Sequence, residues 1–269
     1  HWLRAGRPEG PWCVEVIDPS ENKKHAAKIK IRAALHIHAY YIDLLEDMVE
    51  RLGFKGPPLD LFLSVTSEAD AAQAHKLLDP YRRGALEVRV VPNRGRDIGP
   101  FLTAFGARLR SYDVIGHLHT KESHDLIDRE FVRHWREYLL VNLVGPELHS
   151  ADAILKRFSE DPRLGMVYPD DPHLLDWSDN LEIASTLAQR MGIANLPETP
   201  PSFPVGMMYW ARPAALAPLF DLNLDWSDYP EEPLPYDGSM LHALERLLPI
   251  VVAHAGYRRA AVHVPGSTR

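Results

Sequence analysis

Residues 29–40 read IKIRAALHIHAY, an apolar run with hardly any alternation of apolar and polar residues. A strand that is buried on both faces of a parallel sheet has this pattern. Residues 41–52 follow with apolar side chains at helical spacing, which predicts an amphipathic helix that ends at Gly53. A second apolar stretch, residues 59–66, predicts the next buried strand.

The alternation of strands and helices continues along the first half of the chain. Residues 88–92 and 114–118 predict two more strands, and residues 98–109 predict the helix between them. The first 125 residues therefore read as a β-α-β-α-β-α-β series, which implies a parallel sheet covered by helices. Ligands of such sheets bind beyond the carboxyl ends of the strands.

The second half of the chain predicts a mixed order of elements. Helices are expected at residues 131–143, 150–158, 180–191 and 238–248, and strands at 164–168 and 206–211. For the last helix, Asp237 stands where a cap belongs, and Pro249 is expected to end the helix. We therefore expect an α/β protein whose parallel half is followed by a mixed α/β half.

Composition excludes several classes of protein. The 269 residues include 30 Lys and Arg against 37 Asp and Glu, and the net charge of −7 argues against a dedicated nucleic-acid binder. A single cysteine, Cys13, excludes an internal disulfide framework and a cysteine-based zinc site. No apolar run is long enough to span a bilayer. Residues 1–30 read as a linker at the end of an upstream module, and His1 in place of Met indicates a cut inside a longer polypeptide.

The densest polar group follows the third predicted strand, where residues 93–100 read NRGRDIGP. Gly95 permits unusual backbone angles, and the helix that begins here offers N–H groups and a dipole that suit an anion. Arg94 and Arg96 can grip a phosphate in bidentate fashion. A charged loop with an Arg96–Asp97 ion pair is the alternative.

Two predicted strands end in pairs of histidines, His36 with His38 and His117 with His119. Alternate residues of a strand share a face, so each pair can point in one direction. Imidazole is a common zinc ligand, which makes a metal site one interpretation. Histidines bonded to the backbone in a pocket or core are the other. Lys121 adds a point charge that suits phosphate.

Acidic and aromatic residues gather before the last predicted helix. Asp237 can act as a general base if it faces a cleft, although a helix cap is the plain alternative. Glu231 and Glu232 precede it. Nearby aromatic rings can stack on sugars or belong to the core. These aromatic residues are Trp210, Trp226, Tyr229 and Tyr236.

Five segments of the chain, taken in order, resemble the rhamnan synthesis protein F family of bacterial polysaccharide glycosyltransferases. Each segment alone is a loose motif, whereas five in order between residue 31 and about residue 257 form a specific match. The segments are residues 34–41 (ALHIHAYY), 93–100 (NRGRDIGP), 117–123 (HLHTKES), 203–212 (FPVGMMYWAR) and 237–248 (DGSMLHALERLL).

The resemblance implies a nucleotide-sugar-dependent transferase that extends an O-antigen or a capsule-like glycan, with dTDP-rhamnose as the namesake donor. It also implies a GT-A-like fold for residues 31–269, with a Rossmann-like nucleotide-binding sheet in residues 31–125 and an acceptor half in residues 126–269. GT-A enzymes carry an Asp-X-Asp metal motif where this chain has HLH at residues 117–119. We therefore expect no metal cofactor, and cationic side chains would neutralise the diphosphate.

The convergence of the strand ends and the position of Asp237 at a helix start, taken together with the resemblance, predict roles for the candidate residues. Asp237 is expected to deprotonate the acceptor hydroxyl in an inverting displacement. The residues expected on the acceptor side are Trp210, Glu231, Glu232 and Tyr236. The residues expected to bind the donor and its diphosphate are His36, His38, Tyr40, Thr66, Ser67, Asn93, Arg94, Gly95, Arg96, Asp97, His117, His119 and Lys121.

The expected partners are a nucleotide-sugar donor, a lipid-linked or polysaccharide acceptor and other domains of a longer polypeptide, but no nucleic acid. The protein is expected in the cytoplasm, bound peripherally at the inner face of the cytoplasmic membrane. Two other classes stay open. One is a metal-dependent hydrolase built on the two His-X-His pairs. The other is a non-catalytic glycan-binding module, although a neutral glycan needs no cluster of cations.

Overall fold

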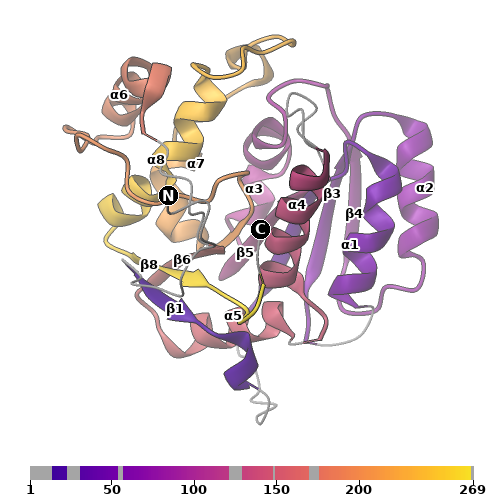
Figure 1. Ribbon diagram of the computed structural model, residues 1–269. Coiled ribbons are helices and arrows are strands. Elements are labelled where there is room, and N and C mark those ends of the chain that lie inside the picture. The colour runs from indigo at the N-terminus through magenta and orange to yellow at the C-terminus, as the bar shows by residue number, and fades with distance from the viewer. Residues whose placement is uncertain are drawn as a thin grey trace.

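In the computed structural model, a mixed sheet runs through the protein and helices cover both of its faces (Figure 1). The structure describes residues 14–22, 31–53, 57–120, 129–147, 149–169 and 176–267. Most of the expected linker 1–30 lies outside these residues. The strands are β1 (Glu15–Ile17), β2 (Ala33–His38), β3 (Asp60–Val65), β4 (Leu86–Val90), β5 (Val114–His119), β6 (Leu164–Pro169), β7 (Tyr209–Ala211) and β8 (Arg258–Val262).

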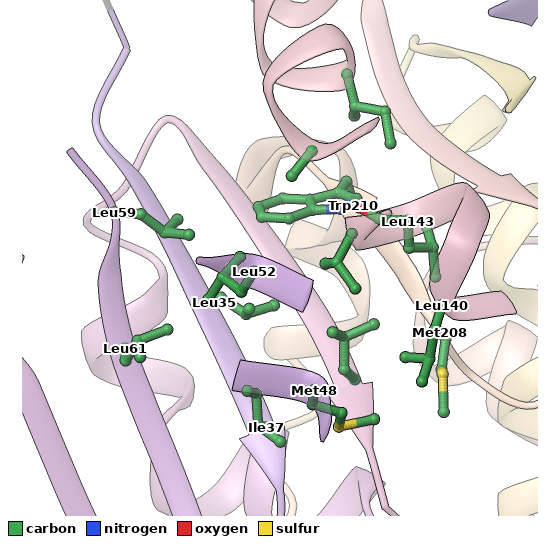
Figure 2. Packing of buried hydrophobic residues seen from close by; sticks show 14 of the residues in the cluster. Leu35, Ile37, Met48, Leu52, Leu59, Leu61, Leu140, Leu143, Met208 and Trp210 are labelled. Carbon is green, nitrogen blue, oxygen red and sulfur yellow. Dashed lines mark hydrogen bonds between the residues drawn. The ribbon is translucent and has the colours of Figure 1, made fainter. Parts of the chain in front are cut away.

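The helices divide between the two faces of the sheet, because each packs its apolar side into a separate buried cluster. The first cluster, part of which is drawn in Figure 2, includes α1 (Leu45–Leu52), α2 (Glu68–Leu78), α4 (Arg129–Val144) and α5 (Ser150–Glu160). The second cluster includes α3 (Gly106–Leu109), α6 (Leu181–Arg190), α7 (Ala217–Phe220) and α8 (Met240–His254).

The strand order in the sheet is β1-β8-β6-β7-β5-β2-β3-β4. The pairs β2–β3, β2–β5 and β3–β4 are all parallel, as the alternation of strands and helices predicts. In the second half, β7 lies antiparallel between β5 and β6, while β8 runs parallel to both β6 and β1. The expected α/β class, with a parallel half followed by a mixed half, is confirmed.

Strand β2 shows how the two faces of the sheet differ. Leu35 and Ile37 point to the cluster of α1 and α4, where Figure 2 shows them among leucine and methionine side chains. His36 and His38 point to the opposite face, because successive residues of a strand alternate in direction. The same alternation places His117 of β5 on that opposite face, directly paired with His36.

The helix expected at residues 98–109 is not continuous. It consists of a π-helical turn, η3 (Pro100–Ala104), followed by the short helix α3. The N–H of Phe105 bonds to the carbonyl of Pro100, and the Arg89 guanidinium donates to the carbonyl of Ala104. The expectation of a regular helix is wrong here because a distant arginine takes a carbonyl that a regular helix would use.

Helix α8 also departs from the expectation. Ser239, rather than Asp237, is its cap, and the Ser239 hydroxyl accepts a hydrogen bond from the N–H of His242. Pro249 lies inside the helix and does not end it. A proline there loses one backbone hydrogen bond, to Glu245, at a cost of about 3 kcal/mol. Buried side chains on both sides of Pro249 offset this cost, as Val251 illustrates.

The helices in the described part of the chain include none with the length and apolar character that crossing a membrane requires.

Candidate active site

Residues 93–97, here called the arginine loop, follow β4 and lie against Tyr229. Gly95 (φ +74°) and Arg96 (φ +50°) have left-handed backbone conformations. A Cβ atom at Gly95 would lie 2.8 Å from Cγ of Tyr229, so a glycine fits there and a larger residue does not. Arg94 Nε donates to the Tyr229 carbonyl at 2.8 Å, which ties the loop to the second half of the chain.

Gly95→Ala is expected to destabilise the protein more than Gly256→Ala. The two glycines have φ values of +74° and +82°, so each alanine costs about 1–2 kcal/mol of backbone strain. Only Gly95 adds a clash with Tyr229, since nothing lies within 4 Å of a Cβ at Gly256. Urea unfolding of the two variants measures the difference. Equal losses would show that Tyr229 does not confine the loop.

Both arginines of the loop face acidic side chains from the segment before α8. Arg96 Nε lies 3.4 Å from Glu232 Oε1, and Arg94 Nη1 lies 3.9 Å from Glu231 Oε1. The Glu231 side chain is 84% exposed, so water screens its pair with Arg94. Ion pairs of this kind contribute little to stability. An incoming anion with better geometry can therefore compete for both guanidinium groups.

Beneath the arginine loop, five buried side chains form a continuous hydrogen-bonded chain, here called the histidine relay. Asp97 Oδ2 lies 3.0 Å from His117 Nε2. The Nδ1 atoms of His117 and His36 are 3.0 Å apart. Ser64 Oγ lies 3.0 Å from His36 Nε2 and 2.9 Å from His38 Nδ1. The relay thus joins the arginine loop to the strand ends of β5, β2 and β3.

Burial and neighbouring charges determine the protonation states of Asp97, His117 and His36 in the relay. Burial lowers the pKa of His36 and the pKa of His117, so both imidazoles are neutral near pH 7. Burial by itself would raise the pKa of Asp97, but His119 and the hydrogen bond from His117 outweigh it and hold that pKa below its usual range. Asp97 bonds inward to His117, so the alternative Arg96–Asp97 ion pair is not found.

Two residues that were expected to contact the donor, His36 and His117, are buried in the relay. His36 and His117 are both 0% exposed. Their rings are stacked at an interplanar angle of 3°, within the second buried cluster of side chains. The expectation that these two residues touch the donor is therefore wrong, because they lie below the surface and carry no charge that could neutralise a diphosphate.

His119 joins the two halves of the site. Its Nε2 donates to the carbonyl of Gly206 at 2.7 Å, and the Gly206 N–H donates to Glu245 Oε1 at 2.6 Å. Among the described residues, the buried Nδ1 of His119 has no hydrogen-bond partner. Sequence reasoning missed Gly206 and Glu245 as site residues, although both stand in segments that carry the family resemblance.

The Asp237 carboxylate is held in place from α8 and from the turn before α6. Asn180 Nδ2 donates to Asp237 Oδ1 at 2.8 Å. The same oxygen lies 3.4 Å from Arg246 Nη2 and 3.7 Å from His242 Nδ1. The side chain remains 20% exposed, so the carboxylate is oriented and still reachable. Nothing in the spacing of the sequence pointed to Asn180 as its partner.

The arginine loop and the start of α8 border a common hollow. A cavity of about 530 Å³ is lined by Arg94, Gly238 and Ser239, among other residues. Burial, followed by the charge of Arg96, lowers the pKa of His242, which places Arg96 close to the first turn of α8. Asp237 lies 3.7 Å from the same imidazole, so the arginine loop and the segment that carries Asp237 lie next to each other, although neither Arg96 nor Asp237 lines this cavity.

The other expected donor contacts lie near the strand ends. Ser67 caps α2, where its hydroxyl accepts from the Asp70 N–H at 3.1 Å and donates to the Asp70 carboxylate at 2.6 Å. Tyr40 and Thr66 are half-buried beyond the ends of β2 and β3, and Asn93 is exposed. Their contact with a nucleotide stays a prediction.

The two aromatic residues expected on the acceptor side, Trp210 and Tyr236, differ in their exposure to solvent. Trp210 is fully buried, and its indole Nε1 donates to the carbonyl of Leu143 at 3.1 Å. The expectation that Trp210 contacts an acceptor is wrong, because core packing surrounds it. Tyr236 is 76% exposed and could stack on a sugar ring. Lys121 lies outside the described residues.

The histidine pairs do not form a metal site in the part of the chain that the structure describes. No group of three or more His, Cys, Asp or Glu side chains there is arranged to hold a metal ion. His36 and His38 bond to Ser64, and His119 bonds to Gly206. This geometry gives no support to a hydrolase built on the two pairs. The expected independence from metal stays a prediction.

The fold and the site define an α/β protein with a cationic loop and an oriented carboxylate beyond the carboxyl edge of its parallel strands. A family model described as rhamnan synthesis protein F matches residues 2–257. The chain belongs to this family, as its five sequence segments predict.

Two curated relatives, both described as uncharacterized protein WxcX, come from strains of Xanthomonas campestris pv. campestris. Each is 35% identical to this chain over 236 residues. The match covers 86% of this chain and 32% of each relative, so the chain spans about a third of their length.

Two solved structures share features of the fold at low similarity. Mouse xyloside xylosyltransferase 1 in its apo form is 10% identical, with a TM-score of 0.39, covering 87% of this chain and 84% of that chain. Core-mannan synthase A from Aspergillus fumigatus in an Mn/GDP form is 13% identical, with a TM-score of 0.37, covering 98% of this chain and 80% of that chain. Similarity at this level carries no argument about what the present chain binds.

Proposed function

We propose that this chain is a glycosyltransferase domain that uses a nucleotide-diphosphate sugar to extend a bacterial surface polysaccharide such as O-antigen or capsule. The observation that carries the proposal is the shared hollow between the arginine loop and the start of α8. Loosely paired guanidinium groups suit a diphosphate, and an oriented, reachable carboxylate suits an acceptor hydroxyl. Membership of the rhamnan synthesis family supports the same activity and makes dTDP-rhamnose the first donor to test.

The proposed reaction is a direct displacement with inversion. Asp237 takes the proton of the acceptor hydroxyl while that oxygen forms a bond to the anomeric carbon. The bond between the anomeric carbon and the diphosphate oxygen breaks, and the leaving nucleoside diphosphate gains negative charge. Arg94 and Arg96 stabilise that charge, with Lys121 as a further candidate. The neutral imidazoles of His36 and His117 take no part in neutralising it.

The setting of the reaction is part of the proposal. The acceptor is a lipid-linked or polysaccharide chain, and the protein works in the cytoplasm at the inner face of the membrane. Other domains of a longer polypeptide would bring the acceptor to this one. The alternatives are a glycan-binding module, which would bind sugar without nucleotide, and a metal-dependent hydrolase.

Thermal unfolding with dTDP, UDP, GDP and CMP, each with and without EDTA, tests the proposal. A ligand at about a hundred times its dissociation constant stabilises the folded state by roughly 2.7 kcal/mol, which gives a clear rise in Tm. We expect one nucleoside diphosphate to raise the Tm, and we expect EDTA to leave the rise intact. The double variant Arg94→Gln, Arg96→Gln should lose the response. A folded sample that responds to no nucleotide would contradict the proposal.

A further inference from the structure

A second cavity lies at the opposite edge of the sheet from the arginine loop. Its volume is about 360 Å³, and small-molecule sites occupy about 300–1,000 Å³. Among its lining residues, Asp113 precedes β5, Pro162 precedes β6 and Tyr257 precedes β8. Arg212 follows β7, which runs antiparallel to β5. This cavity, here called the amino-edge pocket, therefore lies where the parallel strands begin. Strand β5 has six residues, so the two edges are about 20 Å apart.

Arg212 lines the amino-edge pocket with a guanidinium group that is held in place from one side. Its Nε donates to the carbonyl of Leu164 at 2.9 Å. Its Nη2 donates to the carbonyls of Phe158 and Asp161 at 2.6 and 3.1 Å. Among the described residues, Nη1 has no acceptor. Nη1 is therefore the nitrogen of this fixed group that can donate to a ligand in the pocket.

Asp113 and Tyr257 add unpaired polar atoms to the same pocket. One carboxylate oxygen of Asp113, Oδ2, accepts from the Arg32 N–H at 2.7 Å, and within the described part of the chain the other oxygen has no donor. The Tyr257 hydroxyl has no partner there either. Burial lowers the pKa of Arg212, and Tyr257 and Asp113 act against that shift, so both lie close to the guanidinium.

The charges around the pocket suit a neutral, hydroxyl-bearing ligand. Arg110, a further lining residue, is paired with Asp221 at 2.7 Å. Of the remaining charged groups, Arg212 would repel a cation and Asp113 would repel an anion. A hydroxyl suits both, because it can accept from a guanidinium and donate to a carboxylate. Pro213 adds an apolar wall that suits the C–H face of a sugar ring.

We propose that the amino-edge pocket binds a neutral glycan through hydroxyl groups that bridge Arg212 and Asp113. These two side chains form no ion pair with each other in the described structure, so the space between them is open to a ligand. Adjacent hydroxyls of one sugar ring supply the acceptor and the donor that they require. The choice of a glycan over other hydroxyl-rich ligands rests on the proposed function, whose product is a polysaccharide. The pocket would hold a part of that polysaccharide away from its reacting end.

Saturation-transfer NMR of the full chain tests the inference. The probes are the methyl glycosides of rhamnose, mannose, galactose and N-acetylglucosamine, each at millimolar concentration and without nucleotide. We expect saturation transfer from the wild type to at least one probe. We expect its loss in Ala214→Phe, because Ala214 is an exposed wall of the pocket and a phenyl ring there takes the space of the ligand. A wild type that transfers saturation to none of the probes would overturn the inference.

Ala72→Phe is the matched control, because Ala72 is an exposed alanine on α2 and does not line the pocket. This variant should keep the signal of the wild type. The double variant Arg94→Gln, Arg96→Gln should also keep it, since those arginines belong to the opposite edge of the sheet. A folded Ala214→Phe with the full signal would show that the glycan binds elsewhere and would overturn the inference.

Asp113→Asn is a second variant that decides the outcome if Ala214→Phe does not fold. Asp113 is exposed, and the amide oxygen of asparagine can still accept from the Arg32 N–H. The charged acceptor for a sugar hydroxyl is lost, so the dissociation constant of the bound probe should rise. An unchanged dissociation constant would contradict the proposed bridge. The glycan signal needs no nucleotide, so failure of this inference and failure of the proposed transferase activity are separate results.

Discussion

Asp237→Asn is expected to lower the rate of glycosyl transfer by about 10²- to 10⁴-fold, the usual contribution of a general base. An asparagine keeps the size of the side chain and can still accept the hydrogen bond from Asn180, but it cannot take the proton of an acceptor hydroxyl. Turnover of dTDP-rhamnose, or of whichever donor raises the Tm, measures the effect. Binding of the nucleoside diphosphate should change little, because the proposed role of Asp237 is on the acceptor and not on the donor.

Asp79→Asn is the matched control for this substitution. Asp79 is an exposed carboxylate at the end of α2, and the same chemical change there should leave turnover unaltered. Arg246 also donates to the Asp176 carbonyl at 2.9 Å, so losing the charge of Asp237 should not unfold the protein. Full turnover by a folded Asp237→Asn would remove Asp237 as the base. Glu232 or Glu231 would then be the next candidate.

Trp210→Ala is expected to lower the free energy of unfolding by about 3–5 kcal/mol. Figure 2 shows the indole ring near Leu143 and packed among aliphatic side chains. A Cβ added at Gly116 would lie 2.9 Å from the ring, so the strand beside Trp210 leaves no spare room. The alanine therefore leaves a large cavity that the neighbouring strands cannot close. Urea unfolding measures the loss.

Trp210→Phe separates packing from hydrogen bonding at this position. The phenyl ring fills most of the space, while the Leu143 carbonyl loses its bond from the indole N–H. We expect a smaller loss than for alanine, since one unpaired buried carbonyl costs about 1–3 kcal/mol. A loss below about 1 kcal/mol for Trp210→Ala would be incompatible with a tightly packed core position. It would reopen the predicted contact with the acceptor.

The parallel half of the fold can be predicted from the sequence because its signals are local. A strand buried on both faces is rich in apolar residues along its length, and β2 (AALHIH) and β3 (DLFLSV) each have four apolar residues among six. Ser67 precedes α2 and caps it as its position predicts, because a cap needs nothing beyond the first turn of its own helix.

The continuation of α8 through Pro249 could not be predicted in this way. A proline costs about 3 kcal/mol inside a helix, and the sequence signal for a stop is therefore strong. Leu248, Val251 and Val252 are buried against other elements, and each contributes about 1.5–3 kcal/mol. The sum favours the longer helix, but it depends on partners that are distant in the chain.

The sequence by itself determined the alternation that makes a parallel sheet, the glycine-containing arginine loop at a strand end and the carboxylate of Asp237 before a helix. Only the tertiary structure decided that His36 and His117 are neutral, that Trp210 belongs to the core and that Asn180 orients Asp237. The physical reason is that local backbone preferences are written in neighbouring residues. The charge and exposure of a side chain depend on what distant segments pack against it.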